Sequence, residues 1–529
     1  MEFYEDIISR ILSEKTLSKD KLHQLKITLC KKYNLKTIPS NSSILAHIPK
    51  DFSENDQKLL VSVLRKKPMR TISGVAIVAV MTSPEACPHG TCIPCPGGPE
   101  YHSPQSYTGS EPAAMRAEMH GFDPFLQVQA RLNQLKAIGH EVDKIDLIIM
   151  GGTFTARSPW YQEWFVKRCY DAMNDRESCS LYEAKTLNEN ARSRCIGLTI
   201  ETRPDWLRIQ HVDTILDFGA TRVELGVQTV FDDVLYIMKR NHTVLDSIAA
   251  TRIAKDSGLK VCHHMMPGLP GSDEQEDLDA FTTLFNDSDF KPDMIKIYPT
   301  LVVKGTPLYD MWKENRYTPL STEKAQKLIA RIVSTIPEWV RIQRIQRDVP
   351  AQHIDAGVTK SNLRQLVDEE LRSNKKKSLD IRVREIGHLH SSEHDDIRFD
   401  DIVLKKTIYD ANKGTEVFLQ LLGKPSNALL GYLRLRDVFQ PHRWELQKHP
   451  CMIIREVKVV GREVGIGVND TESWQHKGFG SQLVQAAEKI CVEEFDKKWL
   501  FVLSGVGVKQ YYRKYHGFSD NGIYLSKKL

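Results

Sequence analysis

The sequence predicts an α/β protein in which a partial barrel of parallel strands is preceded by a few helices and followed by a smaller α/β domain. Two observations carry this prediction. Short apolar runs alternate with helical patterns from residue 71 to about residue 370, which indicates about six βα repeats. From about residue 391 the pattern changes to short strands around one glycine-rich turn and a long helix. A chain of 529 residues has room for three such domains.

Composition is that of a soluble globular protein from a reducing compartment. Hydrophobic residues make up 41% of the chain and charged residues 27%. Ten cysteines in a chain of this length do not form a disulfide scaffold. The N-terminus is acidic where a secretory signal is basic, and the apolar run 74–81 is too short to cross a bilayer. We therefore expect a cytoplasmic protein with no membrane partner.

Residues 1–70 predict a small basic helical domain. This segment carries 14 Lys and Arg against 8 Asp and Glu, so it holds the whole positive excess of a chain whose net charge is +5. Ile7, Ile8 and Ile11 fall on one helical face. Such a domain could dock on a folded RNA through phosphate contacts, although an ordinary solvated helical surface explains the charge equally well.

A cysteine loop follows the first predicted strand. Cys87, Cys92 and Cys95 lie within nine residues, in a stretch too rich in proline and glycine to be helix or strand. Three thiolates without a nearby fourth suit a 4Fe–4S cluster with one open iron, which could hold the amino and carboxylate groups of S-adenosylmethionine. There are two alternatives. One is a zinc site in which His89 joins the cysteines as a ligand, and the other is that the three thiols lie close together by chance.

Further reactive or flexible residues follow the other predicted strands. Because the carboxyl ends of parallel strands meet at one edge, we expect these residues to share a pocket with the cysteines. We assign S-adenosylmethionine binding to Gly151, Gly152, Glu201, Arg203 and Gln228. Lys296 and Tyr298 end the sixth strand and are candidate catalytic residues. His263 and His264 end the fifth predicted strand.

Three arginines at equal spacing lie near the end of the domain of residues 71–370. Arg341, Arg344 and Arg347 could line a path for tRNA, or they could belong to a solvated helix face or a strand edge. Residues 371–390, which include three consecutive lysines, predict a linker between residues 71–370 and the last domain.

The last domain, residues 391–529, has the signature of a coenzyme A site. Short strands are predicted at 428–436, 452–460 and 499–503, and the turn Gln475–Ser481 opens a helix over 482–495. Glycines in such a turn leave backbone N–H groups and the helix dipole free to hold a pyrophosphate. Tyr511 and Tyr512 follow the last strand, where a domain of the GNAT acetyltransferase type contacts the thioester, and Tyr512 is a third candidate catalytic residue.

These motifs together resemble one family, the catalytic subunit of Elongator, in which a radical S-adenosylmethionine barrel is fused to a GNAT domain. The resembling stretches include CPHGTCIPCPGGP, QSYTGSEPAAMRA, GLTIETRPD, HHMMPGLPG and QHKGFGSQL. The resemblance implies Cys87, Cys92 and Cys95 as cluster ligands. It implies contacts with acetyl-CoA from Lys144, Glu456, Val457, Lys458, Val459, Phe479, Gly480, Ser481 and Tyr512.

The function that the resemblance implies is the formation of 5-carboxymethyluridine at wobble position 34 of tRNA. The cofactors would be a 4Fe–4S cluster, S-adenosylmethionine and acetyl-CoA, and the partners a tRNA anticodon stem-loop, with a homodimer or other Elongator-like subunits. Relatives carry cysteines in the linker associated with zinc; residues 377–387 here have none, so we expect packing and charge to hold the linker. The alternatives are a protein-lysine acetyltransferase with a structural iron–sulfur domain and a non-catalytic tRNA-binding subunit.

Overall fold

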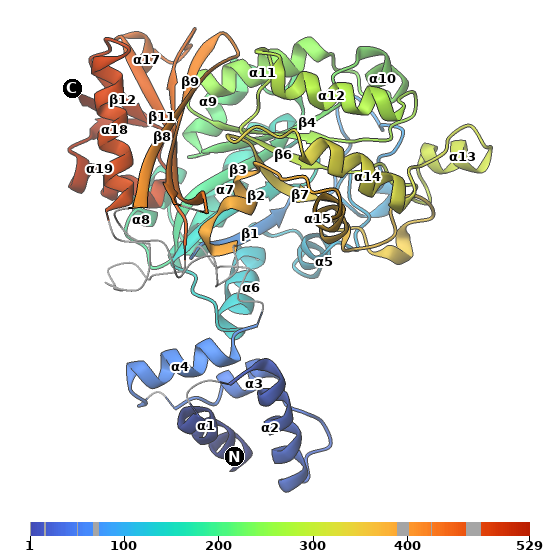
Figure 1. The fold of residues 1–529 in the computed structure, drawn as a ribbon, viewed down its shortest axis with the longest axis vertical. Coiled ribbons are helices and arrows are strands. Elements are labelled where there is room, and N and C mark those ends of the chain that lie inside the picture. The colour runs from blue at the N-terminus through green and yellow to red at the C-terminus, as the bar shows by residue number, and fades with distance from the viewer. Residues whose placement is uncertain are drawn as a thin grey trace.

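The N-terminal helices form a small domain of their own. The computed structural model describes residues 2–14, 17–49, 51–66, 74–388, 401–424, 426–461 and 478–529. Figure 1 shows the N-terminal helices set apart below the rest of the chain, close to α6. Their junction includes a hydrogen bond from the Lys66 N–H to the Ile138 carbonyl, 3.2 Å. The helices are α1 (Glu2–Glu14), α2 (Lys19–Lys32), α3 (Asn41–Leu45) and α4 (Glu54–Leu64).

The predicted parallel barrel is confirmed, with seven strands where about six were expected. The strands follow one another in chain order across an open, fully parallel sheet (Figure 1). The seventh, β7, contains Arg341 and Arg344, so this basic run belongs to an edge strand. The strands are β1 (Ala76–Met81), β2 (Lys144–Met150), β3 (Arg194–Thr202), β4 (Arg222–Gln228), β5 (Lys260–Met265), β6 (Met294–Ile297) and β7 (Arg341–Ile345).

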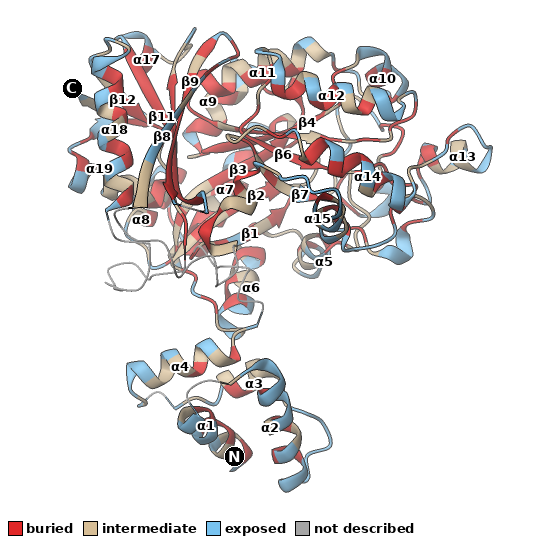
Figure 2. Ribbon diagram, in the orientation of Figure 1, coloured by how far each residue is buried: buried red, intermediate tan, exposed pale blue. Residues whose placement is uncertain are grey.

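Helices cover the outer face of this sheet, and Figure 2 shows the mostly buried strands at the centre, with helices around them that carry exposed residues. Ile145, Leu147 and Ile149 of β2 are fully buried, which is the alternation expected of a strand packed on a helical layer. The helices are α5 (Pro112–Met119), α6 (Pro124–Ala137), α7 (Pro159–Asn174), α8 (Leu181–Asn188), α9 (Ile209–Asp217), α10 (Asp232–Ile237), α11 (Val244–Asp256), α12 (Glu274–Asn286), α13 (Pro307–Lys313), α14 (Thr322–Val333), α15 (Leu363–Ser373) and α16 (Ile381–Arg384).

The C-terminal domain is a second seven-stranded sheet, of mixed direction, as the predicted fold class requires. Its order is β13-β14-β12-β11-β10-β9-β8, and β11 and β12 form its parallel pair. Its elements are β8 (Ile402–Ala411), β9 (Gly414–Gly423), β10 (Ala428–Asp437), α17 (Trp444–Gln447), β11 (Cys451–Val459), α18 (Phe479–Glu493), β12 (Trp499–Val502), α19 (Lys509–His516), β13 (Ser519–Asn521) and β14 (Tyr524–Lys528).

One hydrophobic cluster joins the barrel to the C-terminal domain, which also has a core of its own. Ile453, Phe501 and Tyr524 of the second sheet pack into the same apolar cluster as the barrel strands. Beside them, the fully buried Arg455 bonds Asp293 of the barrel at 2.6 Å and Glu416 of β9 at 2.8 Å. A shared cluster with buried, paired charges fixes how the two sheets face each other.

The linker is held by packing and charge in its described part, which ends at His388. The Asp380 carboxylate accepts hydrogen bonds from the Ile342 N–H at 2.8 Å and from Arg364 at 2.9 Å. Ile381 is fully buried, and Glu385 pairs with Arg341 at 3.0 Å. Among the described residues, no helix is both long enough and apolar enough to span a membrane.

Candidate active site

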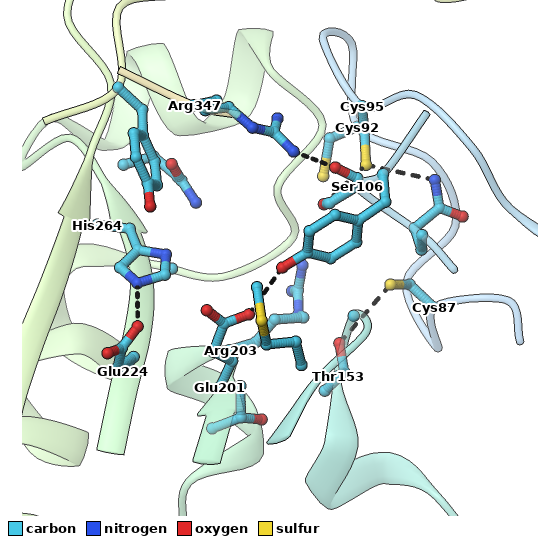
Figure 3. A pocket seen from close by; sticks show the side chains of 18 of the residues that line it. Cys87, Cys92, Cys95, Ser106, Thr153, Glu201, Arg203, Glu224, His264 and Arg347 are labelled. Carbon is cyan, nitrogen blue, oxygen red and sulfur yellow. Dashed lines mark hydrogen bonds and ion pairs between the residues drawn. The ribbon is translucent and has the colours of Figure 1, made fainter. Parts of the chain in front are cut away.

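The three thiols of the cysteine loop meet at the carboxyl edge of the barrel. Cys87, Cys92 and Cys95 line one cavity, which we call the rim pocket (Figure 3). The loop needs glycine at Gly97, because φ is +77° there and a Cβ would lie 2.1 Å from the Tyr107 carbonyl oxygen. Other residues that line the rim pocket are Gly152, Glu201, Arg203, Glu224, Gln228, Arg240, His264, Lys296, Tyr298, Arg344 and Arg347.

Each thiol has polar neighbours that suit a metal-bound sulfur. Cys87 lies 3.6 Å from the Thr153 hydroxyl, and burial raises the pKa of this thiol. Hydrogen bonds to cluster sulfurs are one of the ways in which a protein tunes an iron–sulfur centre. The remaining contacts are His89 Nε2 at 3.0 Å and Arg240 Nη1 at 3.4 Å from Cys92, and Ser106 Oγ at 3.2 Å and Gln105 Nε2 at 3.3 Å from Cys95.

The rim pocket also contains buried polar atoms that lack a hydrogen-bond partner within the protein. They are Arg203 Nη1, Gln228 Oε1, Arg240 Nε and His89 Nδ1. Leaving such an atom unpaired costs about 1–3 kcal/mol, so this group of atoms indicates a polar ligand. An iron–sulfur cluster on the thiols, with the carboxylate, amine and ribose hydroxyls of S-adenosylmethionine beside it, fits this set of residues.

The residues predicted to bind S-adenosylmethionine gather here. Gly152, Glu201, Arg203 and Gln228 line the rim pocket. Gly151 lies next to it, and its carbonyl accepts a hydrogen bond of 3.0 Å from the Thr82 hydroxyl.

Lys296 and Tyr298 also reach the rim pocket, as the strand-end argument expects. Lys296 lies between two carboxylates: it donates to Glu201 at 3.2 Å and pairs closely with Glu224. Burial opposes the charge of Lys296, but Glu224 and its neighbours raise the pKa of the ammonium group well above its usual range. Glu201 also accepts a hydrogen bond of 3.0 Å from the Tyr107 hydroxyl. Lys296 is therefore a fixed cation in the pocket.

A second and larger cavity, the interdomain pocket, lies between the barrel interior and the C-terminal sheet. Its volume is about 600 Å³, against about 170 Å³ for the rim pocket. Glu456, Val457, Lys458 and Tyr512, all predicted to contact acetyl-CoA, line it. Its walls on the barrel side include Asp146, Gly197, Arg222, Lys260 and Arg341.

The beginning of α18 supplies the other predicted coenzyme A contacts. Gly480 packs so closely on Tyr511 that a Cβ would lie 2.7 Å from the tyrosine hydroxyl. Phe479 is buried beneath this turn, and Ser481 Oγ lies 3.5 Å from His516 Nε2. Val459 ends β11, one residue beyond Lys458. Gln475, His476 and Lys477 lie outside the described residues.

The three arginines at equal spacing do not share one surface. Arg341 is ion-paired with Glu385 in the interdomain pocket, whereas Arg347 lines the rim pocket and donates to the Ser106 carbonyl. Arg344 pairs with Asp348 at 2.6 Å and is 43% exposed. Their common role in binding tRNA stays a prediction, and the ion pair gives Arg341 a structural explanation. Lys144 begins β2, at the end of the strand opposite the rim.

The two pockets are neighbours along the barrel interior. Arg344 lines both of them. On β4, Arg222 lines the interdomain pocket and Glu224, two residues on, lines the rim pocket. Two residues of a strand span about 7 Å, so one layer of side chains separates the cavities. The sites predicted for the cluster and for coenzyme A therefore face each other through the barrel.

The sequence analysis did not identify some residues of the rim pocket and the interdomain pocket. Gln105, Ser106 and Tyr107 belong to a stretch that resembles the family but carries no motif of known chemistry, and Arg240 follows no predicted strand. Glu385 belongs to the interdomain pocket although it lies in the linker. Tyr107, Arg240 and Glu385 are brought to their sites by contacts between distant segments, which one sequence does not reveal. Gln105 and Ser106 reach Cys95 from 10 and 11 positions further along the same loop region.

Known proteins share these features over the whole length of the chain. The model of the ELP3 N-terminal domain matches residues 1–72, that of the Radical SAM superfamily residues 81–284, and that of the Radical_SAM C-terminal domain residues 292–373. With the thiol pocket and the second sheet, these matches define the class: a radical S-adenosylmethionine protein whose barrel is followed by a second, mixed α/β domain.

Individual relatives narrow the class to one family. The tRNA uridine(34) acetyltransferase of Methanocaldococcus jannaschii is 48% identical, covering 99% of this chain and 97% of its own. Elongator complex protein 3 of Homo sapiens is 40% identical over 99% of this chain and 96% of its own. The solved structure of the Methanocaldococcus infernus Elp3 with an N-terminal deletion superposes with a TM-score of 0.77 at 44% identity, covering 87% of this chain and all of that one. The chain belongs to the Elongator complex protein 3 family.

Proposed function

We propose that this protein modifies the wobble uridine of tRNA, joining the acetyl carbon of acetyl-CoA to C5 of the base to give 5-carboxymethyluridine at position 34. The observation that carries the proposal is the adjacency of the rim pocket and the interdomain pocket, which share Arg344. The names of the relatives, tRNA uridine(34) acetyltransferase and Elongator complex protein 3, agree with it.

The residues of the two pockets have different roles in this reaction. Cys87, Cys92 and Cys95 would hold a 4Fe–4S cluster, which would supply reductive cleavage of S-adenosylmethionine and so radical chemistry at the acetyl methyl group. Arg203 and Gln228 offer unpaired polar atoms for the S-adenosylmethionine, and Lys296 places a fixed cation beside the reacting groups. Glu456 to Lys458 hold the coenzyme along β11, where a strand offers backbone groups to its pantetheine arm.

The tRNA must present its base to the rim. A wobble base has to leave its stack to reach a pocket of this kind, and basic residues must hold the stem. Arg344, exposed at this edge, and the basic N-terminal domain are the candidates for those contacts. A cytoplasmic location and assembly with a second copy or with Elongator-like subunits belong to the same proposal.

The test is an anaerobic reaction of the reconstituted protein, with its cluster reduced by dithionite, with tRNA, acetyl-CoA and S-adenosylmethionine. The proposal expects a uridine whose mass has increased by a carboxymethyl group, only when all three are present. Acetyl-lysine without a modified nucleoside would indicate a protein acetyltransferase, and tRNA binding without either product would indicate a non-catalytic subunit.

A further inference from the structure

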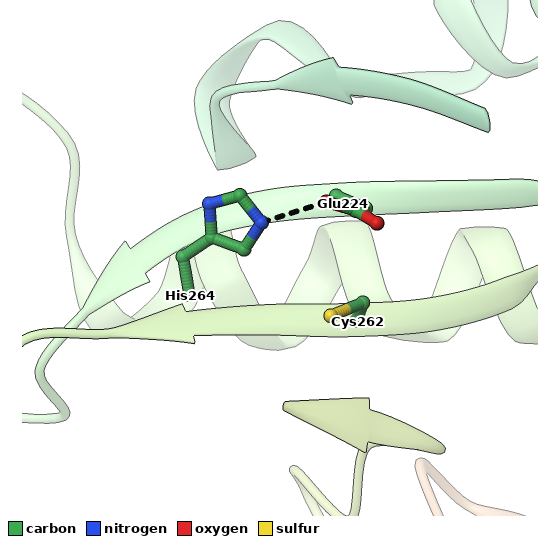
Figure 4. Close-up of side chains that lie close together, drawn as sticks. All are labelled: Glu224, Cys262 and His264. Atoms are coloured by element: carbon green, nitrogen blue, oxygen red, sulfur yellow. Dashed lines mark hydrogen bonds and ion pairs between the residues drawn. The ribbon is translucent and has the colours of Figure 1, made fainter. Parts of the chain in front are cut away.

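His264 presents one ring nitrogen to the rim pocket while the other is fixed by a buried acid. His264 Nε2 lies 2.9 Å from Glu224 Oε2, and the His264 side chain is 14% exposed (Figures 3 and 4). Among the described residues, no protein hydrogen bond is recorded for Nδ1 of this ring. A histidine held in this way carries its proton on Nε2 and directs the Nδ1 lone pair into the cavity.

Glu224 is suited to fixing this ring. Its side chain is 1% exposed and has cationic neighbours in Lys296, with which it pairs closely, and in Arg222 at 3.5 Å. Burial opposes the charge of this carboxyl, but Lys296, His264 and Arg222 lower its pKa well below the usual range. The carboxylate therefore stays ionised as an acceptor for the Nε2–H group, and it would stabilise an imidazolium.

The other acids and the other histidine of the rim pocket are already engaged. Glu201 accepts from Tyr107 and Lys296, Glu111 accepts from the Thr108 N–H at 3.0 Å, and Asp348 pairs with Arg344. The His89 ring contacts the Cys92 sulfur at 3.0 Å. His264 is thus the histidine that combines an open nitrogen with a carboxylate behind it.

The position of His264 on β5 places it between the two cofactor sites. Lys260, on the same face of the strand, lines the interdomain pocket, and His264 lines the rim pocket. Four residues of strand span roughly 13 Å, with Cys262 between them. A coenzyme A thioester that extends from the interdomain pocket toward a uridine in the rim pocket passes along this face of β5.

We propose that His264 is the general base that activates water to hydrolyse the coenzyme A thioester on the uridine, with Glu224 as its positioning residue. This inference rests on the proposed function, in which the new carbon–carbon bond leaves the acetyl group attached both to uridine C5 and to coenzyme A.

In the hydrolysis, His264 Nδ1 takes a proton from water as the water oxygen bonds to the thioester carbonyl carbon. The carbon–sulfur bond then breaks and the proton passes from the imidazolium to the leaving sulfur. The products are free coenzyme A and the carboxylic acid, which releases its proton to solvent and becomes the carboxylate. The Lys296 ammonium, bound to the same Glu224, lies where it can stabilise the developing oxyanion.

The test uses the reconstituted protein and tRNA, and compares His264→Gln with His263→Gln as the matched control. His263 is the next residue of β5 but faces the opposite way, where its ring is buried against the Thr251 hydroxyl at 2.9 Å. Thermal unfolding and the visible absorbance of the cluster confirm that both variants are folded and loaded. The modified tRNA is digested to nucleosides, and the masses of the nucleosides are measured by mass spectrometry.

We expect His264→Gln to accumulate a uridine joined to coenzyme A through the thioester, because loss of a general base slows its step about 100-fold or more. His263→Gln should give the carboxymethyl nucleoside. Added imidazole should restore hydrolysis in His264→Ala, which a purely structural defect would not allow.

Two results would overturn the inference: release of the carboxymethyl nucleoside by His264→Gln at the rate of the unaltered protein, or the absence of any adduct while S-adenosylmethionine is still cleaved. Failure of the unaltered protein to modify uridine at all would instead overturn the proposed function on which the inference rests.

Discussion

Buried charges are arranged differently in the rim pocket and at the interface between the two sheets. At the interface, Arg455 bonds both Asp293 and Glu416 and is fully buried. In the rim pocket, Arg203 pairs with Asp205 at 3.0 Å, yet its Nη1 atom has no partner. Pairing secures the docking of the domains. In the rim pocket, by contrast, unpaired polar atoms of Arg203, Gln228 and Arg240 gather around one cavity, where a ligand can complete the site. Substitutions in the two regions should therefore have different effects.

The largest effect on function is expected from Cys92→Ala in the rim pocket. The variant should lose the visible absorbance of the cluster and all tRNA modification, because two thiolates do not hold the cluster. Binding of acetyl-CoA in the separate interdomain pocket should persist, as measured by calorimetry. Modification by a protein without cluster absorbance would contradict the assigned role of the thiols.

The largest effect on stability is expected from Arg455→Met at the interface. Removing this guanidinium leaves Asp293 and Glu416 buried without their main partner, which should lower the free energy of unfolding by about 3–5 kcal/mol. Urea denaturation measures the change. The control is Arg331→Met: Arg331 pairs with Glu274 at 2.9 Å, but both side chains are about half exposed, so the loss should be at most about 1 kcal/mol. Equal losses of unfolding free energy in the two variants would contradict the distinction between the buried ion pairs of the interface and an exposed ion pair.

A smaller effect, which depends on pH, is expected at the linker. Burial opposes the charge of Glu385, but Lys458 and Arg341 lower its pKa from the usual 4.5 to about 2. Since the folded pKa lies below the unfolded one, the ion pair stabilises the protein above pH 5 and its contribution is lost as the pH falls toward 2. The shift corresponds to about 3 kcal/mol.

Glu385→Gln should therefore lower stability near neutral pH and flatten the dependence of stability on pH between about 5 and 2. Unfolding measured at several pH values checks this. An unchanged slope in the variant would show that Glu385 does not hold the linker through its charge.

Strands and pocket residues were predictable from the sequence to different extents. Apolar runs at 73–81, 145–150, 195–200, 223–227, 259–263 and 294–298 predicted β1 to β6, because strands buried on the core face need continuous apolar residues. β8 and β9 were not predicted; half-exposed lysines in β8, such as Lys405 and Lys406, interrupt its apolar pattern. The strand-end rule brought Glu201, Gln228 and Lys296 together correctly.

The contacts between distant segments were not predictable. The pairing of Arg341 with Glu385 depends on how the linker folds back onto β7, and nothing local in either segment encodes it. The same holds for Arg240, whose approach to the Cys92 sulfur joins residues 148 positions apart. Periodicity gives the elements and the edge at which they end, but the partners across the site require the folded chain.

The claim that both pockets serve one reaction is tested most directly with acetyl-CoA deuterated at the methyl group. The reconstituted protein is incubated anaerobically with this acetyl-CoA, tRNA and S-adenosylmethionine. The masses of the products are then measured by mass spectrometry. We predict deuterium in 5′-deoxyadenosine and the remaining label in the group on uridine C5, because the methyl must reach from the interdomain pocket into the rim pocket. Unlabelled 5′-deoxyadenosine together with a modified uridine would contradict the account.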